Sequence, residues 1–167
     1  MYAKQAPAPG SAARPLLVRL PNHLGDACMA LPAIARLGDL GYAPLLVGRA
    51  WAPRLFESRD WPVLGLAPGP LGTRLRALRA FARDHGARAT LLLTNSFSSA
   101  LEARLAGLVP AGYARDGRSL LLRPAIAVPH EWAQGTLHTS AWYWRLAGVV
   151  AGLSPAEADA GLPAPAL

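Results

Sequence analysis

The residue best placed to do chemistry in this sequence is Asp26, which follows an apolar run, a tight turn and a glycine. Residues 16–20, apolar except for Arg19, form this run, and Pro21 and Asn22 make the turn. Gly25 and Asp26 then open a segment with helical spacing of apolar residues. In open α/β sheets, ligands bind where the carboxyl ends of strands meet helix N-termini. A carboxylate there faces a cleft, so Asp26 is a candidate general base.

A purely structural role for Asp26 is open as well. An aspartate at a helix start accepts backbone N–H bonds and complements the helix dipole. Position 29 is Met, so no capping box supports that role. A helix N-terminus also stabilises the carboxylate and weakens it as a base, unless partial burial offsets this effect. Spacing alone leaves both interpretations of Asp26 open.

Two further polar segments are candidates for ligand binding. Residues 94–99 (Thr-Asn-Ser-Phe-Ser-Ser) close an apolar run and open a helical segment, so Asn95 and Ser96 can serve as turn and capping groups. The same residues could line a polar pocket whose free N–H groups point at a sugar or phosphate. Residues 113–119 form a turn in which Arg115 and Arg118 could bind a carboxylate or phosphate, or lie in a solvated loop.

Several familiar site motifs are absent from the sequence. The first loop has one glycine in place of G-x-G-x-x-G, and neither a P-loop nor a G-x-S-x-G elbow occurs. The four histidines are scattered, with no pair at metal-ligand spacing along one helix. We therefore expect no metal site and no bound cofactor.

Apolar runs alternate with helical stretches along the chain. The predicted strands lie at residues 15–20, 44–48, 62–66, 89–94 and 111–113. The predicted helices lie at residues 26–40, 50–58, 71–85, 97–106 and 136–150, and residues 120–128 are extended. Glycines at 41, 86 and 107 end three of these helices. This alternation predicts an α/β fold: a Rossmann-like parallel sheet with helices on both faces.

Composition is typical of one globular domain with flexible ends. The chain has 167 residues, 52% of them hydrophobic, a single cysteine and a net charge of +7 that comes almost wholly from arginine. No apolar run approaches the roughly 18 residues that cross a bilayer. We expect a flexible leader over 1–14, the folded domain over 15–152, and a linker over 153–167. The positive charge reflects either composition bias or an anionic partner.

Three segments together resemble the lipopolysaccharide heptosyltransferases, which are family 9 glycosyltransferases. They are residues 20–33 around Gly25 and Asp26, residues 93–100 with Asn95 and Ser96, and residues 112–122. The resemblance covers about residues 16–152 and corresponds to the family's N-terminal domain. It implies the N-terminal half of a GT-B enzyme, in which two Rossmann-like domains face each other across a cleft.

The resemblance also implies a reaction. The family transfers heptose from ADP-heptose to the lipid A-linked inner core, with inversion and without a required metal. Asp26 matches the family's catalytic aspartate, Asn22, Gly25, Asn95 and Ser96 lie in matching cleft loops, and Arg115 and Arg118 would meet anionic groups of the acceptor. Because the ADP-binding domain has no counterpart in these 167 residues, we expect little or no activity from the chain alone. A cytoplasmic location is implied, with or without peripheral contact with the inner membrane.

Two other classes of function stay open at this stage. A non-catalytic module that binds an anionic glycolipid or saccharide could use the same cleft. Nucleic-acid binding is a third option, but the sequence has no basic strand interleaved with aromatic residues and no recognition-helix pattern. We therefore expect no nucleic-acid partner.

Overall fold

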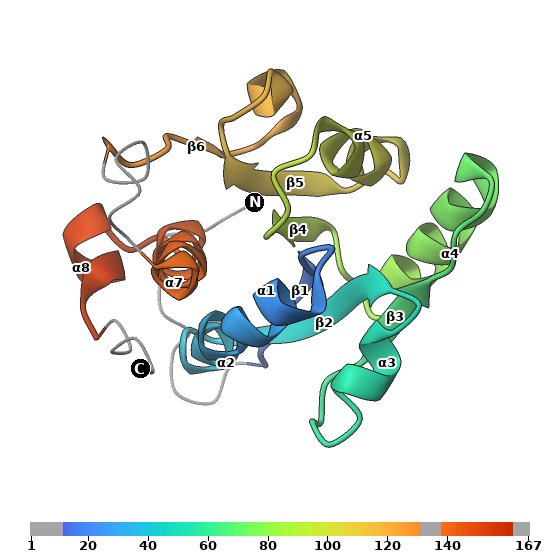
Figure 1. Cartoon of the computed structure of the whole chain (residues 1–167), viewed down its shortest axis with the longest axis horizontal. Coiled ribbons are helices and arrows are strands. Elements are labelled where there is room, and N and C mark those ends of the chain that lie inside the picture. Colours follow the sequence, from blue (N-terminus) through green and yellow to red (C-terminus); the bar gives the residue numbers. More distant parts are fainter. Residues whose placement is uncertain (1–11, 131–137, 162–167) are drawn as a thin grey trace.

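A computed structural model describes residues 12–130 and 138–161 of the chain, which form one parallel sheet covered by helices (Figure 1). The sheet has six strands in the order β3-β2-β1-β4-β5-β6, and every pair of neighbours is parallel. The strands are β1 (Arg14–Arg19), β2 (Tyr42–Arg49), β3 (Val63–Leu66), β4 (Ala89–Leu92), β5 (Val109–Tyr113) and β6 (Ala125–Ile126).

Helices cover both faces of this sheet. The helices are α1 (Leu24–Met29), α2 (Leu31–Asp39), α3 (Ala52–Leu55), α4 (Leu71–Asp84), α5 (Phe97–Leu105), the 3-10 helix η1 (Arg118–Leu121), α7 (Thr139–Val150) and α8 (Pro155–Asp159). Figure 1 shows α1, α2 and α7 on one side of the sheet and α4 and α5 on the other. This arrangement confirms the predicted α/β fold. None of the described helices combines the length and apolar character needed to cross a membrane.

The core consists of two apolar layers, one on each face of the sheet. Along β1, Leu16 and Val18 face the layer that contains α2 and α7, whereas Leu17 faces the layer that contains α4 and α5. Successive side chains of a strand point to opposite faces, so a strand buried on both sides must be apolar at every position. All three residues are almost fully buried, which explains why the run 16–18 lacks polar alternation.

The prediction of one continuous helix over residues 26–40 is wrong. The chain forms α1 and α2 instead, with Ala30 as the C-cap of the first helix and the N-cap of the second. Pro32 lies in the first turn of α2, where its missing N–H leaves no helical bond unmade. In one continuous helix, Pro32 could not donate the usual backbone hydrogen bond to the preceding turn. The first helix therefore ends before Ala30, and a second helix starts after it.

The ends of the folded part differ from the expected leader and linker. Arg14, expected at the end of the leader, begins β1, and residues 1–11 lie outside the described part of the chain. Residues 155–159, expected in the linker, form α8 with a capping box between Ser154 and Glu157. Ala158 of this helix is fully buried, and Arg36 Nη1 donates a 2.6 Å hydrogen bond to its carbonyl oxygen. Residues 162–167 lie outside the described part as well.

The strand order fixes where a ligand can enter. From β1 the chain proceeds outward to β2 and β3, and it then returns to place β4 on the other side of β1. The loops after β1 and β4 therefore leave the sheet edge in opposite directions and open a crevice between them. Open α/β sheets bind ligands at such a switch point.

Candidate functional site

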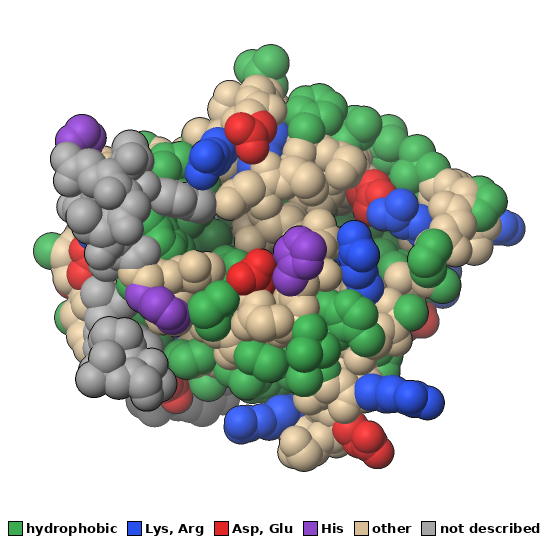
Figure 2. All heavy atoms as spheres, viewed as in Figure 1, with side chains coloured by type: hydrophobic (Ala, Val, Ile, Leu, Met, Phe, Trp, Pro, Cys, Tyr) green, Lys and Arg blue, Asp and Glu red, His purple; other side chains and the backbone are tan. Residues whose placement is uncertain are grey.

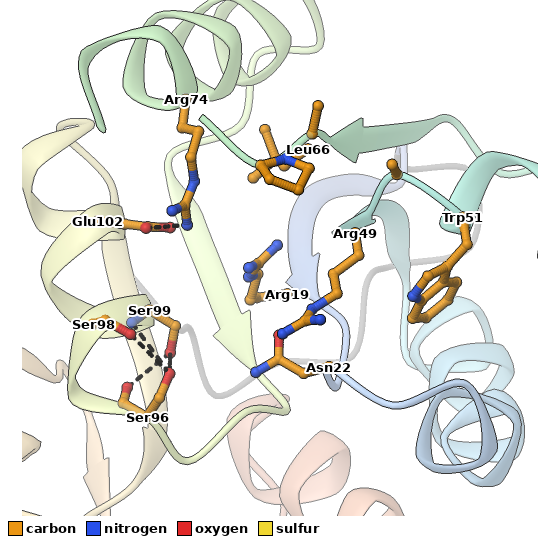
Figure 3. A pocket seen from close by; sticks show the side chains of 13 residues that line it. Arg19, Asn22, Arg49, Trp51, Leu66, Arg74, Ser96, Ser98, Ser99 and Glu102 are labelled. Atoms are coloured by element: carbon orange, nitrogen blue, oxygen red, sulfur yellow. Dashed lines mark hydrogen bonds and ion pairs between the residues drawn. The ribbon is translucent and has the colours of Figure 1, made fainter. Parts of the chain in front are cut away.

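A cleft of about 600 Å³ opens at this crevice, above the carboxyl ends of the central strands (Figure 3). It is lined by Arg19, Asn22, Arg49, Ala50, Trp51, Leu66, Ala67, Pro68, Arg74, Ser96, Ser98, Ser99 and Glu102. Asn22 and Ser96 were both predicted as ligand-binding residues, and the fold brings them to the same cleft from the loops after β1 and β4. Their ability to bind a ligand stays a prediction.

The serine-rich segment after β4 is built as a helix cap. Ser96 is the N-cap of α5, and its hydroxyl oxygen accepts a 3.3 Å hydrogen bond from the Ser99 N–H. The Ser99 hydroxyl donates to the Ser96 carbonyl oxygen at 2.8 Å and lies 2.6 Å from the Thr94 hydroxyl. The capping role expected for this segment is confirmed, and the cap holds Ser96 at the wall of the cleft.

Arg118 lies in the protein interior, away from the cleft lining. It is fully buried, and its guanidinium donates hydrogen bonds to the carbonyl oxygens of Tyr113 and Thr94 and to Asn95 Oδ1. The bonds to Tyr113 and Asn95 measure 3.0 and 3.1 Å. Burial lowers the pKa of Arg118 to about 10. The structure therefore gives Arg118 a different task from the expected contact with an acceptor anion: it ties the loop after β4 to β5.

Gly112 makes room for this arginine. A Cβ atom at position 112 would lie 3.2 Å from Arg118 Nη2 and 3.2 Å from the Leu92 carbonyl oxygen, closer than side chains normally tolerate. Asn95, which was predicted to bind ligand, is half-buried and accepts a hydrogen bond from the same guanidinium. Its side chain is therefore fixed by Arg118 beside the cleft residue Ser96.

Arg115 lies on the exposed turn between β5 and η1. Its side chain is 47% exposed and its Nε is 3.8 Å from a carboxylate oxygen of Asp116. The turn uses positive φ at Asp116 (52°) and Gly117 (73°). Arg115 is not among the residues that line the cleft, so its predicted contact with an acceptor anion stays a prediction.

Asp26 lies in the first turn of α1, one helix turn beyond the loop that carries Asn22. The N-cap is His23, without a side-chain capping bond, so the alternative role of Asp26 as N-cap is wrong. Asp26 is half-buried and forms no ion pair with any other described residue, and it does not line the cleft itself. Gly25 beside it is exposed, and no described atom lies within 4 Å of an added Cβ. Packing among the described residues therefore does not explain the glycine.

The charge of Asp26 also affects Tyr143 on the helix α7. Burial, and after it the negative charge of Asp26, raise the pKa of the Tyr143 hydroxyl on α7. Asp26→Asn should therefore lower the Tyr143 pKa, which a spectrophotometric or NMR titration of this tyrosine measures. A raised pKa in the folded state contributes stability that is full below the ordinary tyrosine value of about 10 and is lost as the pH rises beyond it. An unchanged Tyr143 titration would place the carboxylate elsewhere.

Sequence reasoning missed the charged residues of the cleft. Arg19 and Arg49 are the last residues of the neighbouring strands β1 and β2, and Arg74 lies in the first part of α4. Arg74 forms an ion pair with Glu102 of α5. The signal that could have found the first two is an arginine that ends a buried parallel strand, because that position faces the ligand edge of the sheet.

Comparison with known proteins shows that the fold of this chain is similar to that of solved structures. No protein-family model and no curated protein matches the sequence. The structure of E. coli heptosyltransferase WaaC with ADP-2-deoxy-2-fluoro heptose matches 84% of this chain and 49% of its own, with a TM-score of 0.64 and 18% identity. The same enzyme with ADP gives a TM-score of 0.67 at 17% identity, over 84% of this chain and 48% of its own.

A third solved structure extends the likeness. Acinetobacter baumannii MurG matches 67% of this chain and 39% of its own, with a TM-score of 0.52 and 14% identity. The chain thus has the Rossmann-like fold found in GT-B glycosyltransferases, and it spans about half the length of the heptosyltransferase chains that it matches.

Proposed function

We propose that this chain is the acceptor-binding half of a GT-B glycosyltransferase of the heptosyltransferase type. The observation that carries the proposal is an open polar cleft at the switch point of the sheet, in a domain with the fold of half of such an enzyme. The resemblance of residues 20–33 and 93–100 to the family supports the same assignment. The donor would be ADP-heptose held by a second domain, and the acceptor an inner-core saccharide linked to lipid A.

Asp26 would act as the general base in this reaction. Its carboxylate would accept the proton of an acceptor hydroxyl while that oxygen forms a bond to the anomeric carbon of the donor. The bond from the anomeric carbon to the ADP oxygen would break at the same time, and ADP would leave with the bonding electrons. Attack from the face opposite the leaving group inverts the anomeric centre. Asp26 forms no ion pair with any other described residue, so no described cation occupies the carboxylate.

The remaining predicted residues would position the acceptor. Asn22 and Ser96 supply polar groups on two sides of the cleft, and Gly25 leaves space for a ligand to approach the start of α1. Asn95 would act through its fixed place beside Ser96. The proposal needs a second domain because holding both reactants in place is worth several kcal/mol of barrier, about 7–11 kcal/mol in well-oriented model reactions.

A fusion experiment tests the proposal. The chain is joined to the C-terminal half of E. coli WaaC, and heptose transfer to an inner-core acceptor is measured with ADP-heptose as donor. We expect transfer by the fusion and no measurable transfer by either half alone. A folded fusion that binds both ADP-heptose and the acceptor yet transfers no heptose would contradict the proposal.

A non-catalytic module that binds an anionic saccharide is the second candidate function. The three arginines of the cleft favour it, because they attract an anion whether or not a reaction follows. The two candidates differ in what Asp26 does. A binding module predicts that the chain alone binds an acidic saccharide, that Asp26→Asn leaves this binding unchanged, and that the fusion transfers no heptose.

A further inference from the structure

The cleft holds a cluster of three arginines with a single carboxylate, which we call the arginine cluster. It consists of Arg19, Arg49, Arg74 and Glu102. In Figure 3 the Arg19 guanidinium lies between the Arg74–Glu102 pair and the side chain of Arg49. Figure 2 shows basic side chains on this same face, between the ends of the central strands and the helices α4 and α5. We propose that the arginine cluster is a binding site for a phosphate group of the ligand.

The strongest observation is that two buried nitrogens of Arg19 lack hydrogen-bond partners in the part of the chain that the structure describes. Its Nε and Nη1 are buried, and neither has a hydrogen-bond partner among the residues that the structure describes. A buried donor without a partner costs free energy, and a charged one costs more than a neutral one. A buried guanidinium with unpartnered N–H groups, at the edge of the sheet where ligands bind, is best explained by a ligand group that accepts its hydrogen bonds.

Two other buried arginines show what a structural role requires. Arg118 donates to two carbonyl oxygens and one amide oxygen, as described above. Arg36 donates to the carbonyl oxygens of Trp144, Ala158 and Glu157, at 3.0, 2.6 and 3.2 Å. Carbonyl and amide oxygens of the chain accept the hydrogen bonds of both, whereas no described residue accepts one from Nε or Nη1 of Arg19. Arg14 also has one unpartnered nitrogen, but its guanidinium stacks on the Tyr42 ring at 4.3 Å.

The charges of the cluster match a phosphate group. Burial lowers the pKa of Arg19; Glu102 opposes this shift, and Arg74 and Arg49 add to it. Glu102 forms an ion pair with Arg74, so the formal charge of the cluster is three positive less one negative, or +2. A phosphate monoester carries about −1.5 to −2 at neutral pH. Guanidinium groups bind phosphate oxygens through paired N–H bonds.

As a statement about the acceptor, this inference rests on the proposed function, but the site itself can be tested on the chain alone. The shared chemistry is a phosphoryl group, which could belong to the acceptor saccharide or to the diphosphate of a nucleotide sugar. Asn22 and Ser98 add neutral polar groups to the cleft wall. Their side chains would form hydrogen bonds with the sugar that carries the phosphate.

The test is calorimetric titration of the full chain with inorganic phosphate at constant ionic strength. We expect saturable binding that Arg19→Met weakens at least about tenfold, because charge-assisted hydrogen bonds are the strong ones. Arg19→Met should also raise or leave unchanged the Tm without phosphate, since it removes donors that have no partner. A lowered Tm would show that Arg19 is structural and would overturn the proposal, as would equal phosphate binding by both proteins.

Two further variants make the result specific. Arg49 is exposed at the cleft rim, so Arg49→Met should keep the Tm and weaken phosphate binding. Arg83 is exposed on α4 and pairs with Asp84 outside the cleft, so Arg83→Met should change neither quantity. Weakening of equal size in Arg83→Met would show a general effect of net charge and contradict a defined site.

Comparing ligands distinguishes the two sources of the phosphate. Tighter binding of glucose 6-phosphate than of ADP indicates an acceptor phosphate, and the reverse order indicates a donor diphosphate. The phosphate site and the proposed reaction can fail separately. Phosphate binding by the unmodified chain, together with no transfer by the fusion, would reject the reaction and keep the site.

Discussion

Asp26→Asn is expected to lower kcat of the fused two-domain enzyme by about 10²- to 10⁴-fold, the usual contribution of a positioned general base. The amide has nearly the shape of the carboxylate but cannot take up a proton from the acceptor hydroxyl. Because acceptor binding does not require that proton transfer, KM for the acceptor should change little. Steady-state heptose transfer at saturating ADP-heptose measures both quantities.

A matched control separates this effect from a general loss of negative charge. Asp39 is exposed at the end of α2 and does not line the cleft, so Asp39→Asn should transfer heptose at the unmodified rate. Circular dichroism and the midpoint of urea unfolding show whether the Asp26 variant keeps its fold. Unreduced kcat in Asp26→Asn would reject Asp26 as the base.

The fold could be predicted well because its signals are local. Runs such as 16–18 and 91–93 are apolar at every position, which only a strand buried on both faces requires. Gly41, Gly86 and Gly107 were predicted to end helices, and all three adopt positive φ at helix ends, at 81°, 67° and 82°. Each of these signals depends on neighbours within a few residues of sequence.

The site could be predicted only in part because its contacts are distant in sequence. The loops after β1 and β4 were identified from turn residues, and the fold brings Asn22 and Ser96 to one cleft. No local pattern shows that Arg19 lacks a partner, since its surroundings come from α4, α5 and the end of β2. Arg19 lies near the end of the strand predicted over residues 15–20, where a charged side chain is ordinarily assigned to solvent. Its burial becomes evident only in the folded chain.

The misplaced expectation for Arg118 has the same physical origin. A charged residue in a glycine-containing turn is usually exposed, and Arg115, three residues earlier, behaves in that way. Arg118 is buried because the carbonyl oxygen of Thr94 and the amide of Asn95, more than 20 residues away, accept its hydrogen bonds. The space that it fills also depends on Gly112 in β5. The chain must fold before these groups meet.

Arg118→Met is expected to reduce the free energy of unfolding by about 3 kcal/mol, through loss of charge-assisted bonds and through buried acceptors left without donors. The Tyr113 and Thr94 carbonyl oxygens lose the donor that Arg118 provides, and Asn95 loses the contact that holds it beside Ser96. The methionine side chain ends near the position of Arg118 Nε, so the space of the guanidinium is left unfilled and adds to the loss. Removing the desolvation cost of the guanidinium offsets part of the loss, which keeps the expected value at the lower end of the range for buried polar networks.

Urea unfolding of Arg118→Met and of Arg115→Met measures the difference between the two arginines of this turn. Arg115 is exposed and pairs only weakly in water, so its replacement should change the free energy of unfolding by less than about 0.5 kcal/mol. Where Arg118→Met still folds, the loop after β4 should lose hydrogen-exchange protection first, because Arg118 ties that loop to β5. Equal stability of the two variants, with phosphate or saccharide binding lost only in Arg118→Met, would instead make Arg118 a ligand-binding residue and require the turn to open in solution.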